Sequence, residues 1–145
     1  MWSKVIPEVC KILEDAGIKY HADASSSLFV HGYDFDMDDF DITVEWNCIE
    51  QARELFMAAS PTEITGISPQ QFQFELGGHL IDIMSYESDS GIGPETERTR
   101  VNYAGARIWS KKPGFYLNRM KKEHPLREAA LLHFNSGSSS HGNLC

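Results

Sequence analysis

The fold is decided by residues 24–44, whose sequence is ASSSLFVHGYDFDMDDFDITV. The first part predicts a brief helix over residues 25–31, because serines favour the start of a helix and Gly32 favours its end. From Asp39 onward, polar and apolar residues alternate with the two-residue period of a half-buried strand. Asp39 and Asp41 therefore project from the same face of one predicted strand.

Helices and a strand are predicted on both sides of this stretch. Apolar residues recur at helical spacing over residues 3–16, and Gly17 is a natural helix stop. Residues 18–22 favour a short strand, and a further helix is predicted over residues 47–59, ending before Pro61. This order of elements predicts the α/β (α+β) fold class, with a small mixed β-sheet and helices packed mainly on one side.

A hairpin is predicted around Gly77-Gly78. Residues 71–76 alternate polar and apolar, residues 79–84 are mostly apolar, and a Gly-Gly pair between two such runs is typical of a tight turn. Asp82 interrupts the apolar strand. A carboxylate in such a place must be paired, neutralised or bound to metal, because burying a lone charge is costly.

The second half of the chain contains another hairpin and two helices. Residues 101–103 and 107–109 favour strands joined by a turn, Pro113 opens a helix, and a final helix is predicted over residues 125–134. Residues 87–99 are rich in Gly, Ser, Asp and Pro and predict a surface loop.

Pairing of the two acidic strands would bring three carboxylates together. Asp39 and Asp41 lie on one strand and Asp82 on the other. Three converging carboxylates repel one another unless a divalent cation lies among them. The sequence therefore predicts a metal site formed by these residues.

The pattern resembles the polymerase-beta-like nucleotidyltransferase superfamily over residues 18–86. In that family a pair of small residues opens a short helix and a Gly closes it, an Asp-x-Asp motif follows on one strand, and a third Asp lies on another. The matching positions are Ala24-Ser25, Gly32, Asp39-Phe40-Asp41 and Asp82. The resemblance implies a small member of this superfamily.

The resemblance also implies roles for these residues. The triphosphate would contact the turn at the helix N-terminus, through Ala24, Ser25 and Ser26. Asp39 and Asp41 would hold Mg²⁺ or Mn²⁺, and Asp82 would complete one metal site and help deprotonate the attacking hydroxyl. The implied reaction transfers a nucleoside monophosphate from a nucleoside triphosphate, such as ATP, to an acceptor hydroxyl on a small molecule, an RNA end or a protein.

A second interpretation is a catalytically degenerate binding or regulatory module, similar to an antitoxin, that keeps the same fold. Ala24 replaces the first Gly of the family's pair, and Phe35 takes the place of an Arg often found before the two acids. These departures bear on catalytic activity more than on fold, and they motivate a module that has lost turnover.

Two other interpretations of the acidic residues remain open. Four acids occupy the first, third, fifth and twelfth positions of a calcium-binding loop pattern, namely Asp34, Asp36, Asp38 and Glu45. The sixth position of such a loop needs Gly and is Asp39 here. Alternatively, Asp39 and Asp41 lie on the solvated face of an edge strand, with Asp82 paired to Arg98 or Arg107.

The charge balance limits the partners. Lys and Arg number 13 against 21 Asp and Glu, a net charge of −8, which argues against general coating of DNA or RNA. Positive charge is concentrated near the C-terminus, at Lys111, Lys112, Arg119, Lys121, Lys122 and Arg127. Such residues are more often a solvated helix face than a phosphate clamp.

Length and cysteine use indicate a small cytoplasmic protein. Of 145 residues, we expect residues 1–134 to form one domain and residues 135–145, which are poor in apolar side chains, to be a disordered tail. Three widely spaced cysteines and the lack of an apolar run of ~20 residues favour the cytoplasm over a membrane. Residues 113–134 are short for an acceptor-binding domain, so a homodimer or a helical partner protein is expected to complete the cleft.

Overall fold

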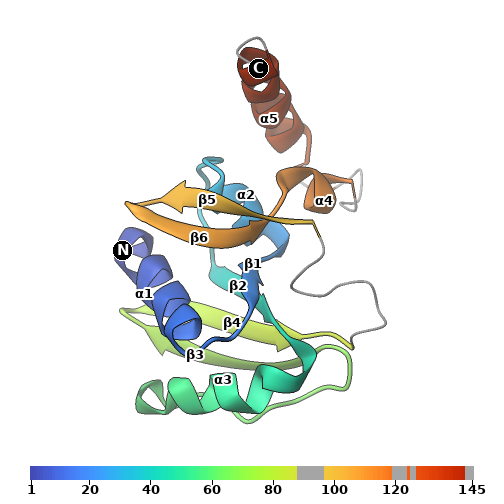
Figure 1. The fold of residues 1–145 in the computed structure, drawn as a ribbon. Coiled ribbons are helices and arrows are strands. Elements are labelled where there is room, and N and C mark those ends of the chain that lie inside the picture. The colour runs from blue at the N-terminus through green and yellow to red at the C-terminus, as the bar shows by residue number, and fades with distance from the viewer. Residues whose placement is uncertain (88–96, 119–123, 125–126, 143–145) are drawn as a thin grey trace.

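One six-stranded mixed sheet forms the body of the protein (Figure 1). The computed structural model describes residues 1–87, 97–118, 124 and 127–142, the last eight by their main chain. The strands are β1 Tyr20–Ala22, β2 Asp39–Val44, β3 Gln70–Leu76, β4 His79–Ser85, β5 Arg98–Tyr103 and β6 Ala106–Lys111. Their order across the sheet is β3-β4-β2-β1-β6-β5. The predicted α/β fold class with a mixed sheet is confirmed.

The central strand β2 has an antiparallel neighbour on one side and a parallel neighbour on the other. It pairs antiparallel with β1 and parallel with β4, and in the second pairing Asp41 lies opposite Asp82. The hairpin of β3 and β4 turns at Gly77 and Gly78, which both have positive φ, as a tight two-residue turn requires. The predicted position of this hairpin is confirmed.

Helices α1 and α3 cover one face of the sheet. The helices are α1 Trp2–Asp15, α2 Ala24–Val30, α3 Ile49–Leu55, α4 Pro113–Leu117 and α5 Arg127–Gly142, with short 3-10 turns at Trp46–Cys48 and Met57–Ala59. The Trp2 ring of α1 lies 6.3 Å from the Phe40 ring of β2, and Phe56, just after α3, stacks on Phe74 at 4.4 Å. The apolar side chains of this face form one buried core, to which each fully buried aliphatic side chain contributes about 1.5–3 kcal/mol.

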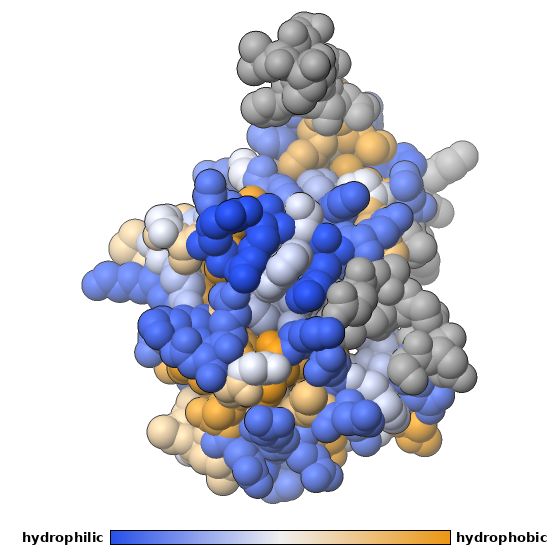
Figure 2. Space-filling model, in the orientation of Figure 1, coloured by the Kyte–Doolittle hydropathy of each residue, from blue (hydrophilic) through white to orange (hydrophobic). Residues whose placement is uncertain are grey.

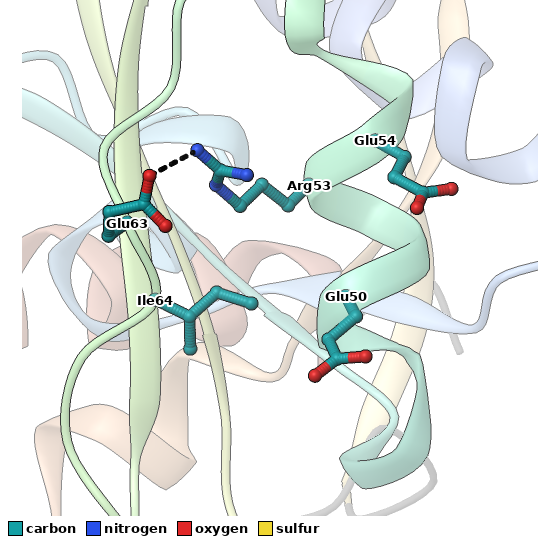
Figure 3. Close-up of a pocket in the computed structure, with 5 residues that line it drawn as sticks. All are labelled: Glu50, Arg53, Glu54, Glu63 and Ile64. Carbon is teal, nitrogen blue, oxygen red and sulfur yellow. Dashed lines mark hydrogen bonds and ion pairs between the residues drawn. The ribbon is translucent and has the colours of Figure 1, made fainter.

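The helix predicted over residues 47–59 is shorter and flanked by two 3-10 turns. The chain leaves it at Ser60, whose φ of 54° is left-handed, and Arg53 then holds the following segment. Its guanidinium donates to the carbonyl oxygens of Pro61 and Thr62 and pairs with Glu63 at 3.3 Å (Figure 3). These contacts close one side of a pocket of about 330 Å³.

Two expectations for the C-terminal half are corrected. Lys111 is not on a solvated helix face: it ends β6, it is fully buried, and its Nζ lies 4.1 Å from the centre of the Phe115 ring. The described part of α5 runs from Arg127 past Phe134, the predicted end, to Gly142 and extends away from the sheet beyond α4 (Figure 1).

Some expectations concern residues that the structure does not describe. Most of the predicted loop and three of the basic residues, Arg119, Lys121 and Lys122, lie outside the described residues. The single-domain organisation and the disordered tail remain predictions. Within the described part of the chain, no helix has both the length and the apolar character needed to cross a membrane.

Candidate active site

Three carboxylates meet on the face of the sheet opposite α1 and α3. Alternation along β2 places Asp39 and Asp41 on one face, and the parallel register places Asp82 beside Asp41. One carboxylate oxygen from each of the three residues lies within 4.8 Å of the others. The structure therefore brings together all three residues that the sequence selects as metal ligands.

Repulsion and burial hold protons on this cluster. Burial, followed by the negative charges of Asp39, Asp82 and Asp23, raises the pKa of Asp41 to about 8. The hydrogen bond that protonated Asp39 makes with Asp82, together with burial and the charge of Asp82, raises the pKa of Asp39 to about 6. A divalent cation would oppose both shifts, because its positive charge favours the ionised form of each carboxylate.

The donor set fits a divalent metal ion. Asp82 is only 9% exposed, and its buried Oδ1 has no hydrogen-bond partner among the described residues. Carboxylate oxygens are the ligands that Mg²⁺ and Mn²⁺ prefer, and a buried unpaired acceptor is costly unless something binds it. Asp39, Asp41 and Asp82 are thus suited to hold such an ion.

A strained turn at the start of α2 lies beside the carboxylates. Ala24 has a φ of 50°, in the left-handed region that Gly adopts most readily. Ser25 is half-buried at this turn, but Ser26 is fully buried. The Oγ of Ser26 accepts a hydrogen bond of 2.8 Å from the main-chain N–H of Asp41, so Ser26 contacts the strand rather than an open surface.

Sequence reasoning missed four residues near the carboxylates. Asp23 is 8% exposed and accepts a hydrogen bond of 2.7 Å from Thr43 Oγ1. Burial and then the charges of Asp23 and Asp41 raise the pKa values of Tyr86 and Tyr116, so both phenols lie within electrostatic range of the acids. Asp23 was detectable as a helix N-cap residue before the small-residue turn, whereas Tyr86 and Tyr116 carry no such local signal.

The two remaining interpretations of the acids are wrong. β2 separates Asp38 from Glu45 by about 20 Å of extended chain, too far for one calcium loop. β2 is a central strand, not an edge strand. Arg98 lies 3.9 Å over the Trp109 ring and donates to the carbonyl oxygen of Tyr20, instead of pairing with Asp82.

The arrangement of the sheet and helices is the fold of solved nucleotidyltransferase structures. TM1012 from Thermotoga maritima, named as a nucleotidyltransferase, has 14% identity and a TM-score of 0.68, covering 94% of this chain and 93% of that one. The lincosamide antibiotic adenylyltransferase LnuA, bound to lincomycin, has 14% identity and a TM-score of 0.69, covering 92% of this chain and 96% of that one. The antibiotic-resistance factor ANT(2'')-Ia has 10% identity and a TM-score of 0.66, covering 98% and 94%. No protein-family model and no curated protein matches the sequence.

Proposed function

We propose that the protein is a metal-dependent nucleotidyltransferase that transfers a nucleoside monophosphate from a nucleoside triphosphate to an acceptor hydroxyl. The observation that carries the proposal is the group of three carboxylates within 4.8 Å, supplied by two parallel strands beside the α2 turn. The fold shared with two antibiotic adenylyltransferases supports the same chemistry and favours ATP as the donor.

Each carboxylate has a role in this proposal. Asp39 and Asp41 hold Mg²⁺ or Mn²⁺, and Asp82 completes the site. When bound, the ion neutralises charge on the phosphates and orients them. Asp82 accepts the proton of the acceptor hydroxyl while the hydroxyl oxygen bonds to the α-phosphorus. The bond between the α-phosphorus and the oxygen that bridges it to the β-phosphate breaks, and pyrophosphate leaves. Ser25, half-buried at the turn, contacts the phosphate chain.

A small molecule is the favoured acceptor. LnuA is described with lincomycin, and ANT(2'')-Ia with adenylyl-2''-tobramycin. An RNA end or a protein hydroxyl is the alternative outcome of an acceptor screen. The short region after β6, formed by α4 and α5 among the described residues, motivates a homodimer or a helical partner that completes the acceptor side. The wide spacing of the cysteines motivates a cytoplasmic location.

Calorimetric titration tests the nucleotide site. ATP, GTP, CTP and UTP are titrated with Mg²⁺ into the native chain and into the Asp39→Ala, Asp41→Ala double variant. We expect nucleotide binding that requires both the metal and the two acids. A native chain that binds no nucleotide, or a double variant that binds as well as the native chain, would contradict the proposal.

A catalytically degenerate binding module is the second candidate. One observation favours it: the main-chain N–H of Ala24 donates a hydrogen bond of 2.8 Å to Asp23 Oδ1. This N–H lies at the turn where a phosphate would bind, and Asp23 already occupies it. Asp23 also adds a fourth negative charge near Asp41. Tight binding to a protein partner, with no transfer to any acceptor under Mg²⁺ or Mn²⁺, would favour this module over the enzyme.

A further inference from the structure

The main chain of Asp41 is held by α2 and by the turn before it. Its N–H donates to Ser26 Oγ at 2.8 Å, and its carbonyl oxygen accepts from the N–H of Asp23 at 2.9 Å. β1 ends at Ala22, opposite Ile42, so the bond from Asp23 continues the antiparallel pairing by one residue, and Ser26 accepts the Asp41 N–H in place of a main-chain partner. The position of Asp41 therefore depends on the geometry of the turn.

The carboxylate of Asp23 joins that turn to β2. Oδ1 accepts from the N–H of Ala24 at 2.8 Å, and Oδ2 accepts from Thr43 Oγ1 at 2.7 Å. Thr43 is fully buried and lies two residues beyond Asp41, on the same face of the strand. Asp23 thus spans the gap between the turn and the strand that carries the metal-binding carboxylates.

The turn needs such support because its conformation is costly. The φ of 50° at Ala24 is disfavoured for a residue with a Cβ, by roughly 1 kcal/mol. The hydrogen bond from Ala24 N–H to Asp23, and the bond of 2.6 Å from Ser27 Oγ to the carbonyl oxygen of Ala24, fix both sides of this residue. Loss of the Asp23 contact would let the turn relax and would move Ser26 relative to Asp41.

We propose that Asp23 is a positioning residue for Asp41, acting through its hydrogen bonds to Thr43 and to the Ala24 turn. The inference rests on the proposed function in one respect, namely that Asp41 is a metal ligand. Residues that orient a ligand by hydrogen bonding typically change metal affinity 10–100-fold when they are altered. The inference therefore predicts an effect on metal binding that needs neither nucleotide nor acceptor.

Mn²⁺ binding by electron paramagnetic resonance tests the inference, with Thr43→Val and Thr43→Ser as a matched pair. Valine keeps the shape of threonine and removes the donor to Asp23, whereas serine keeps the donor. We expect Thr43→Val to weaken Mn²⁺ binding about tenfold and Thr43→Ser to bind within about twofold of the native chain, with circular dichroism unchanged in both. Ser26→Ala, which removes the acceptor for Asp41 N–H, is a second route to the same loss if Thr43→Val does not fold.

Asp41→Ala separates failure of the inference from failure of the proposed function. If Asp41→Ala weakens Mn²⁺ binding while Thr43→Val and Ser26→Ala leave it unchanged or strengthen it, the positioning role is overturned and the metal site stands. Equal losses in Thr43→Ser and Thr43→Val would also overturn the role of the hydrogen bond. If Mn²⁺ binding survives Asp41→Ala, both proposals fall.

Discussion

Two charged regions of this protein are built in opposite ways. On β5 and β6, where strongly hydrophilic side chains gather (Figure 2), Arg100 pairs with Glu14 at 2.7 Å and its guanidinium carbon lies 4.6 Å from the centre of the Trp109 ring. On β2 and β4, Asp39, Asp41 and Asp82 face one another, and this proximity together with burial raises the pKa values of Asp39 and Asp41. Paired charges of the first kind support a fold, whereas a cluster of like charges opposes it and needs a ligand.

The largest expected effect comes from removing a member of the acidic cluster. Asp41→Ala should lower the rate of nucleotidyl transfer about 10³-fold, because it removes a carboxylate that positions charge-stabilising metal. Asp38→Ala is the control: Asp38 is an exposed acid just before β2, and its loss should leave the rate nearly unchanged. Transfer is measured by release of pyrophosphate, and equal rates in both variants would show that Asp41 of the acidic cluster contributes no more to transfer than an exposed acid outside it.

The pH dependence of stability is the next largest effect. Because the folded-state pKa values of Asp39 and Asp41 are raised to about 6 and about 8, the metal-free fold binds extra protons, and its stability falls as the pH rises from about 4 to 8. Asp41→Asn should remove part of this loss and stabilise the metal-free protein at pH 8 by about 2 kcal/mol. Urea unfolding with a chelator present measures the free energy of unfolding of both proteins at pH 8.

That pH effect needs a comparison at low pH. At pH 4 both proteins carry a neutral group at position 41, so Asp41→Asn and the native chain should have similar free energies of unfolding. A variant that is less stable than the native chain at pH 8 would show that Asp41 is held by favourable contacts rather than by repulsion.

Metal binding should stabilise the acidic region selectively. At a Mg²⁺ concentration ten times its dissociation constant, the native chain should gain about 1.4 kcal/mol, seen as a rise in the thermal midpoint at pH 8. The Asp39→Ala, Asp41→Ala double variant should gain nothing, whereas Arg100→Ala should keep the full gain. An equal rise in all three proteins would indicate Mg²⁺ binding elsewhere.

The smallest effect concerns the paired region. Arg100→Ala should lower the free energy of unfolding by about 1 kcal/mol, through loss of the pair with Glu14 and of the contact with the Trp109 ring. Calorimetric Mg²⁺ affinity should not change. A loss of metal affinity in this variant would show that the two regions are coupled.

Local signals explain what sequence reasoning found and what it missed. The Gly77-Gly78 hairpin was predictable because a two-residue turn depends on its own residues. The burial of Lys111 at the end of β6 was not predictable, because it depends on a tertiary contact with the ring of Phe115 in α4. A lysine in a sequence normally indicates an exposed position. The contact between Asp23 and Thr43 joins residues twenty positions apart and has no periodic signature.

The sequence by itself determined that Asp39 and Asp41 share a face, because side chains alternate along any strand. It also placed Asp82 within an apolar strand, where a carboxylate needs a partner. Only the tertiary structure decided that β2 and β4 pair in parallel with Asp41 opposite Asp82, and that the α2 turn holds the main chain of Asp41. Register between strands far apart in the chain is set by the packing of the whole core, and no local pattern encodes it.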